Sequence, residues 1–96
     1  MEEGEYDKST AAHITATTLN PNSAFGHWCF GYVLNRLNRY EEALEQFDLA
    51  IRLSPRDPAV WSYLTLRAVA CYHLGDYAAA VANAREATRT QVVDLV

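Results

Sequence analysis

The chain has 96 residues, of which half are apolar and 21% are charged, so it is long enough for one domain with a modest core. A net charge of −4 and a pI near 5.2 argue against binding to nucleic acid. The polar, acidic N-terminal segment excludes a secretory signal peptide, and no apolar run reaches the ~18 residues of a membrane-spanning helix. These features predict a cytoplasmic protein without a nucleic-acid or membrane partner.

Five helices and no strands are predicted, near residues 7–19, 22–37, 41–53, 58–74 and 77–90. Pro21 ends the first helix and Pro55 the third, because proline lacks the backbone N–H. Asn22 is placed as the N-cap of the second helix. Asp57 is placed as the N-cap of the fourth, with Pro58 at its first helical position. The connections are short, so consecutive helices are expected to run antiparallel.

One helical sequence pattern occurs three times in the chain. Tyr40 follows Tyr6 by 34 residues and Tyr77 follows Tyr40 by 37, and each Tyr lies two positions after a Gly or Asn, residues that tolerate the left-handed conformation at a helix end. Small residues recur at fixed spacing after each Tyr, which lets neighbouring helices approach closely. The turn residues are Gly4, Asn38 and Gly75; the residues three, seven and ten positions after each Tyr are Ser9, His13 and Ala16; Ala43, Phe47 and Ala50; and Ala80, Ala84 and Ala87.

This helix–turn–helix pattern of about 34 residues resembles the tetratricopeptide repeat. The central unit fits best: Gly31, Ala43, Phe47, Ala50 and Pro55 occupy the family's places. The resemblance implies an all-α superhelix of antiparallel helix pairs with two and a half repeats in a single domain, residues 1–96. Its predicted parts are a half repeat (1–21), the central repeat (22–57), the last repeat (58–90) and a tail (91–96).

The last unit departs from the family pattern. Ala84 stands where Phe is usual, Ala68 takes the Gly place, and the first helix carries three extra residues. The first unit retains only its second helix, and a stack of such units needs roughly three for stability. The chain is therefore expected to be part of a longer protein or to associate with itself. Residues 20–58 are similar to repeat segments of bacterial regulators, including those attached to nucleotide cyclases.

Two apolar stripes are predicted on the helix at 22–37, which indicates two neighbours. His27, Phe30, Gly31, Leu34 and Leu37 form the stripe expected to pack on the helix at 41–53. The helix at 58–74 is apolar on nearly all sides and is expected to be the most enclosed. The residues predicted to form an aromatic groove for a protein or peptide are Phe25, Trp28, Tyr32 and Arg36 on the first of these helices and Thr65, Val69 and Tyr72 on the second. The alternative is that they belong to the core or to a homodimer seam.

No pattern typical of catalysis, metal binding or a cofactor is present. His13, His27 and His73 lie on three predicted helices without a ligand at metal-binding spacing. Cys29 and Cys71 lack such spacing too, and are predicted to be buried thiols, with a disulfide as the alternative. The sequence therefore favours a non-catalytic interaction module without a cofactor. A homodimerising structural unit, whose exposed terminal helices and apolar Val92–Val96 seal each other, is the alternative.

Overall fold

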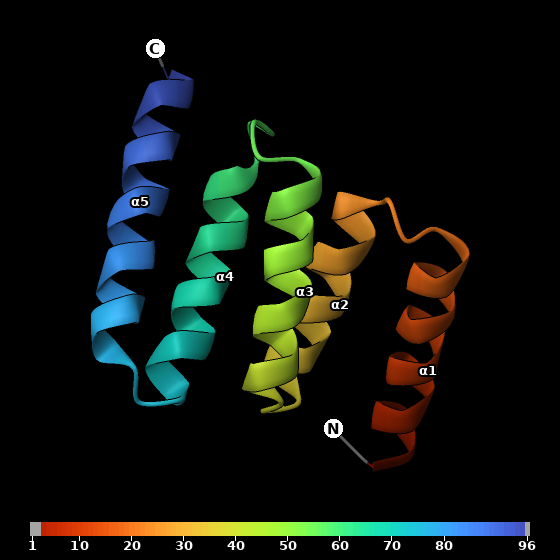
Figure 1. The fold of residues 1–96 in the computed structure, drawn as a ribbon. Helices are drawn as coiled ribbons and strands as arrows, with labels where there is room; N and C mark the ends of the chain where they lie inside the picture. Colours follow the sequence, from red (N-terminus) through yellow and green to blue (C-terminus); the bar gives the residue numbers. More distant parts are fainter. Residues whose placement is uncertain (1–2, 96) are drawn as a thin grey trace.

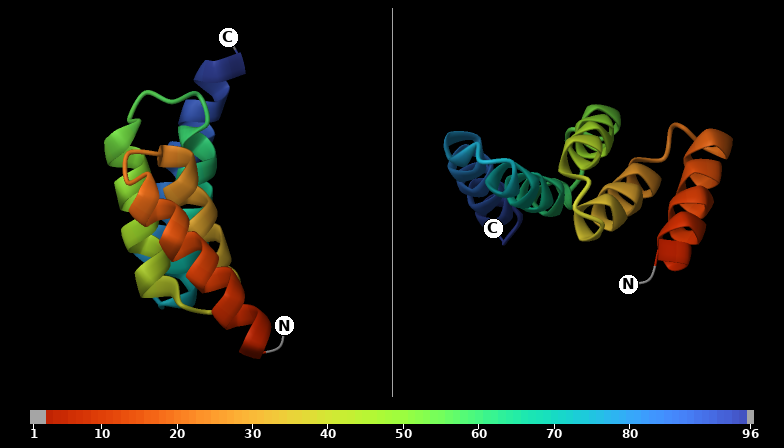
Figure 2. Two further views of the ribbon diagram at one scale, coloured as in Figure 1. Left: turned by 90° about the vertical axis from the view of Figure 1, so that its right-hand side faces the viewer. Right: turned by 90° about the horizontal axis from the view of Figure 1, so that it is seen from below.

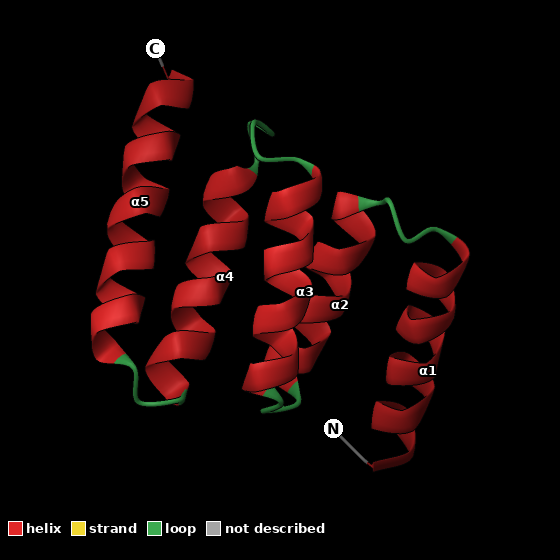
Figure 3. Ribbon diagram, in the orientation of Figure 1, coloured by secondary structure: helices red, strands yellow, loops and turns green. Residues whose placement is uncertain are grey.

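The computed structural model describes the backbone of residues 3–95 and the side chains of residues 10–91. Five helices account for nearly all of this part of the chain, which contains no strand (Figures 1 and 3). They are α1 (Glu3–Leu19), α2 (Ala24–Arg36), α3 (Tyr40–Leu53), α4 (Val60–His73) and α5 (Tyr77–Leu95). The predicted all-α class and helix order are confirmed, and each helix runs antiparallel to the one before it (Figure 1).

Two of the three predicted turn residues end a helix in the left-handed conformation. Asn38 has φ 62° and Gly75 has φ 84°. In each turn the next backbone N–H returns to a carbonyl five residues back, from Arg39 to Leu34 and from Asp76 to Cys71, both at 2.9 Å. The prediction for Gly4 is wrong, because this residue lies inside α1. The side chains of Tyr6, Ser9 and Val92–Val96 lie outside the described residues.

Both predicted N-caps need correction. Ser23, and not Asn22, caps α2: its hydroxyl accepts from the N–H of Gly26 at 3.0 Å. Pro58 precedes α4, which begins at Val60; the Asp57 carboxylate accepts instead from the N–H of Ala59, at 2.8 Å, in the turn before the helix. α5 continues to Leu95, beyond the predicted end at 90, because residues 91–95 contain no Pro or Gly that would stop the helix. The division of the chain into repeats remains a prediction.

The helices form an open row in which α3 lies on one side of α2 and α4 (Figure 2, right). α2 packs mainly against α3, α4 against α5, and α4 also against α3 and, less extensively, α2. Among the described helices α1 packs only against α2, so it lacks the second neighbour that α3 has. Accordingly Ala16, predicted as a close-packing residue, is exposed.

The core lies between α2 and α3. The predicted inner stripe of α2 is buried throughout, and Ala43, Phe47 and Ala50 of α3 have no exposed surface. Gly31 explains the close approach of the two helices: a Cβ at this position would lie 2.5 Å from Cε1 of Phe47. The Phe47 ring therefore occupies the space that a side chain at position 31 would fill.

The fourth helix is not the most enclosed, contrary to the prediction. Tyr63, Ala70 and Cys71 of α4 are buried, but Val69, Tyr72 and Leu74 are exposed. The physical reason is position in the row. The α2–α3 pair has neighbours on both sides, whereas none of the described helices covers the outer face of the α4–α5 pair.

Candidate functional site

An aromatic ladder runs along one face of α2. We use this name for Phe25, Trp28, Tyr32 and Arg36, which recur at helical spacing of three or four. The rings of Phe25 and Trp28 have centroids 5.8 Å apart, those of Trp28 and Tyr32 6.0 Å apart, and both pairs are stacked with 26° between planes. The Arg36 guanidinium continues the row, 5.9 Å from the centroid of Tyr32. The second stripe predicted for α2 is thus one continuous surface.

The middle of the ladder is fixed by the core while its ends are open. Trp28 is half-buried and packs against both clusters of core residues, around Phe47 and around Tyr63. Its indole N–H is buried and has no hydrogen-bond partner among the described residues. Phe25 is 67% exposed and Tyr32 41%. The ladder therefore presents two accessible rings, Phe25 and Tyr32, one on each side of Trp28, which the core holds in place.

The α4 residues predicted for the same groove line a hollow together with residues of α5. Thr65, Val69 and Tyr72 border a hollow of about 460 Å³ between α4 and α5. None of the ladder residues lines this hollow, which is a second candidate surface. We call the second one the α4–α5 hollow; it is lined by Thr65, Ala68, Val69, Tyr72, His73, Ala80, Val81 and Ala84.

The α5 side of this hollow was not predicted as part of a site, although the sequence carried a signal for it. Ala84 occupies the place of Phe47, and Ala68 the place of Gly31. A methyl group thus replaces a phenyl ring, so side chains fill less of the surface between α4 and α5 than between α2 and α3. The hollow lies where the last unit departs from the repeat pattern, on a face that none of the described helices covers.

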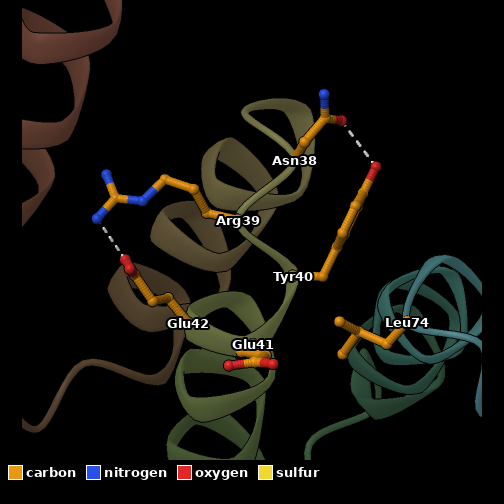
Figure 4. A pocket seen from close by; sticks show the side chains of 6 residues that line it. All are labelled: Asn38, Arg39, Tyr40, Glu41, Glu42 and Leu74. Carbon is orange, nitrogen blue, oxygen red and sulfur yellow. Dashed lines mark hydrogen bonds and ion pairs between the residues drawn. The ribbon is translucent and has the colours of Figure 1, made fainter.

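A smaller hollow, of about 280 Å³, lies where the α2–α3 turn meets the end of α4 (Figure 4). Two pairs of its polar side chains are engaged with each other: the Tyr40 hydroxyl donates to Oδ1 of Asn38 at 2.7 Å, and Arg39 pairs with Glu42. The Tyr40 ring also stacks on His73 with centroids 4.6 Å apart. The stacking packs the start of α3 against the end of α4, and the two polar pairs stabilise the turn before α3, so these residues have a structural role.

The three histidines are used in packing. His13 stacks on Phe30 and His73 on Tyr40. His27 is buried, with Nε2 2.8 Å from the carbonyl oxygen of Pro21 and Nδ1 2.7 Å from Oε1 of Gln46. Because the Pro21 carbonyl can only accept, Nε2 carries the proton. Among the described side chains, no three His, Cys, Asp or Glu gather where they could hold a metal ion.

Both cysteines are free thiols, and the predicted burial holds fully only for Cys71, since Cys29 is half-buried. Burial raises the pKa of each thiol above its ordinary value. Both therefore stay protonated at neutral pH and are poor nucleophiles. Within residues 3–95, no helix has the length and apolar character needed to cross a membrane.

The geometry and the sequence pattern lead to one family. The family model of the tetratricopeptide repeat matches residues 1–58 and, in a second overlapping match, residues 30–91. No curated protein matches the chain. The chain belongs to the tetratricopeptide repeat family, as its sequence indicated. Repeats of this family generally mediate protein–protein interactions and are typically non-catalytic.

Proposed function

We propose that the protein is a non-catalytic interaction module that binds a peptide or a partner domain over the aromatic ladder of α2, with Thr65, Val69 and Tyr72 of α4 as further contacts. The observation that carries the proposal is the ladder itself, a row of stacked rings with exposed ends. Aromatic and arginine side chains are enriched at binding hot spots, because they bring a large contact area with few rotatable bonds.

The arrangement of the ladder supports binding in two ways. The stacked rings are already ordered, so a ligand loses little of its binding energy in fixing them. The Arg36 guanidinium at one end forms no ion pair with any carboxylate of residues 10–91. A ligand that lays an apolar segment on Phe25 and Tyr32 and places an acidic group near Arg36 would use both features.

The test is a selection of binding peptides from a displayed library, followed by affinity measurements on variants. We expect the double variant Phe25→Ala/Tyr32→Ala to weaken binding at least ~10-fold, since these two rings are the exposed part of the ladder. Both side chains are accessible, so helix content by circular dichroism should be unchanged. Leu53→Ala, an exposed apolar residue on α3, is the matched control. Failure to select any peptide, or equal affinity for wild type and double variant, would contradict the proposal.

Homodimerisation is the second candidate function, and one observation favours it. α1 packs only against α2 among the described helices, and it leaves Ile14 and Leu19 exposed. A second copy could cover this surface. Light scattering over a dilution series tests the idea: a dimer that dissociates on dilution and is weakened by Ile14→Ser supports it, whereas a monomer at high concentration removes it.

The setting of the module is also part of the proposal. The similarity of residues 20–58 to segments of bacterial regulators supports a role within a larger regulatory protein. The two unpaired thiols suit a reducing compartment, which supports a cytoplasmic location. We propose no cofactor, metal or nucleic-acid partner, because the sequence motifs for them are missing.

A further inference from the structure

The surface that forms the α4–α5 hollow has an equivalent on the α2–α3 pair, and there the equivalent surface is covered by a helix. A shift of 37 residues relates Ala68, Ala80 and Ala84 to Gly31, Ala43 and Phe47 of the α2–α3 pair. On the α2–α3 pair, this surface is covered by α4. On the α4–α5 pair, none of the described helices covers it, and Tyr72 is 60% and Val81 50% exposed.

The contacts of α4 show how a helix is seated on this surface. Leu66 packs against the core cluster that contains Phe47, and its carbonyl accepts from the Asn35 amide at 3.0 Å. The next residue, Arg67, donates from Nε to the Asp48 carboxylate at 2.8 Å. An apolar residue followed by a charged one therefore fixes the helix on the α2–α3 pair.

Two differences between the pairs determine what would fit on the second one. Ala84 in place of Phe47 leaves room for an apolar residue larger than Leu66. Arg85 in place of Asp48 reverses the charge that faces the following residue. Arg85 is exposed, and it lines a second hollow of about 370 Å³ that shares Val81 and Ala84 with the first. It forms no ion pair with a carboxylate of residues 10–91.

We infer that the α4–α5 hollow binds an amphipathic helix of a partner protein, one that carries a large aromatic residue followed directly by an acidic residue. The aromatic side chain enters the space beside Ala68 and Ala84, and the carboxylate pairs with Arg85. The lining is predominantly apolar, so burial of the aromatic ring supplies most of the affinity and the charge pair selects the partner. This surface shares Thr65, Val69 and Tyr72 with the proposed function but depends on α5.

The probe is a synthetic helix made from the chain's own α4, residues 60–73, with L66F, R67E and C71S, locked in helical form by a lactam bridge on its solvent-facing side. The comparison peptide is identical but retains Arg67. Calorimetric titration against the whole chain should give an affinity about 3- to 10-fold higher for the acidic peptide, the range expected when an exposed pair changes from repulsion to attraction.

Substitutions in the protein identify the surface. Arg85→Asp should reverse the preference between the two peptides. The double variant Ala68→Gly/Ala84→Phe, in which the ring can turn into the hollow, should abolish binding of both. Arg52→Asp, the same charge change at an exposed site on α3, is the matched control and should leave the preference intact. Tyr32→Ala should also leave it intact, which separates a failure of this inference from a failure of the ladder proposal.

Three outcomes would overturn the inference. The first is no saturable binding of either locked peptide to the wild-type chain. The second is equal affinity for both peptides before and after Arg85→Asp. The third is self-association of the chain that Arg85→Asp removes, which would assign the surface to a second copy.

Discussion

The α2–α3 and α4–α5 pairs, which correspond to the predicted central and last repeats, are both antiparallel helix pairs, but their interiors are filled differently. In the α2–α3 pair a glycine and a phenylalanine share one space, with a hypothetical Cβ of Gly31 only 2.5 Å from the Phe47 ring. In the α4–α5 pair two alanines, Ala68 and Ala84, stand at the same places and leave a hollow of about 460 Å³. The Phe47 ring fills the space beside Gly31 in the α2–α3 pair, whereas none of the described side chains of the α4–α5 pair fills the hollow beside Ala68. The comparison suggests that an interaction surface can arise from a missing core residue.

The largest expected effect is the removal of the filling residue. Phe47→Ala should lower the free energy of unfolding by about 3–5 kcal/mol, because it empties a fully buried site between α2, α3 and α4. That is a large share of the total for a small domain. Urea denaturation followed by circular dichroism measures it. Val81→Ala, at an exposed position of the last repeat, should cost less than ~1 kcal/mol, and similar losses for both would remove the distinction between the repeats.

The junction of the two repeats should be sensitive to alkaline pH. Tyr63 of α4 is buried against the central repeat; burial, with the neighbouring Asp57 carboxylate, raises its pKa to about 12. The unfolded chain ionises this residue near pH 10, so stability is unaffected below pH 10 and falls as pH rises from 10 to 12. The loss from this residue is about 2–3 kcal/mol.

The pH dependence can be assigned with one variant. Tyr63→Phe should remove this part of the decline in stability, while wild type retains it in urea denaturation at a series of pH values. Absorbance titration at the phenolate band should show one tyrosine that ionises near pH 12 in folded wild type and is missing from folded Tyr63→Phe. If the variant and the wild type lose stability in parallel, Tyr63 is not the group responsible.

Gly31 and Phe47 should be coupled, so that their substitutions are not additive. Gly31→Ala should cost about 1–3 kcal/mol through overpacking against the ring. In the double variant Gly31→Ala/Phe47→Ala the added methyl no longer meets a ring, so the loss should be smaller than the sum of the two single losses by ~1 kcal/mol or more. A double-mutant cycle in urea checks this, and strict additivity would contradict the contact.

The smallest effect is expected from the reverse exchange in the last repeat. Ala84→Phe alone should change stability little, because the methyl of Ala68 occupies the place where the ring would turn inward. Adding Ala68→Gly should permit that position, so the double variant should be more stable than the sum of its singles by about 1 kcal/mol. A coupling of opposite sign would show that the two helix pairs do not share one packing scheme.

Much of the fold could be predicted from the sequence. The recurrence of Tyr40 and Tyr77 after Asn38 and Gly75 indicated two helix ends, and both have the left-handed backbone that the prediction required. The buried stripe of α2 followed from its spacing of three and four. Helix starts were less accurate, since Ser23 and Asn22 are both good capping residues and only the backbone conformation selects between them.

The candidate site was only partly predictable. The ladder of α2 was visible as a second stripe on one helix, because its four members belong to consecutive turns. The prediction that Val69 and Tyr72 would join it was made by assigning faces from the repeat register and remains a prediction. The hollow that these two residues line with α5 was not predicted. Whether two stripes on different helices face one space depends on helix rotation and tilt, which spacing within a single helix does not encode.

The sequence by itself determined the family, the helical class and the order of the elements, because periodicity, turn residues and small residues are local properties of the chain. The tertiary structure alone decided which apolar faces remain uncovered. Val69 and Tyr72 are as apolar in sequence as the residues of the core, yet they are exposed because none of the described helices packs on that side. Whether an apolar side chain is buried depends on which helices pack against its face, and the packing of the helices in three dimensions determines this.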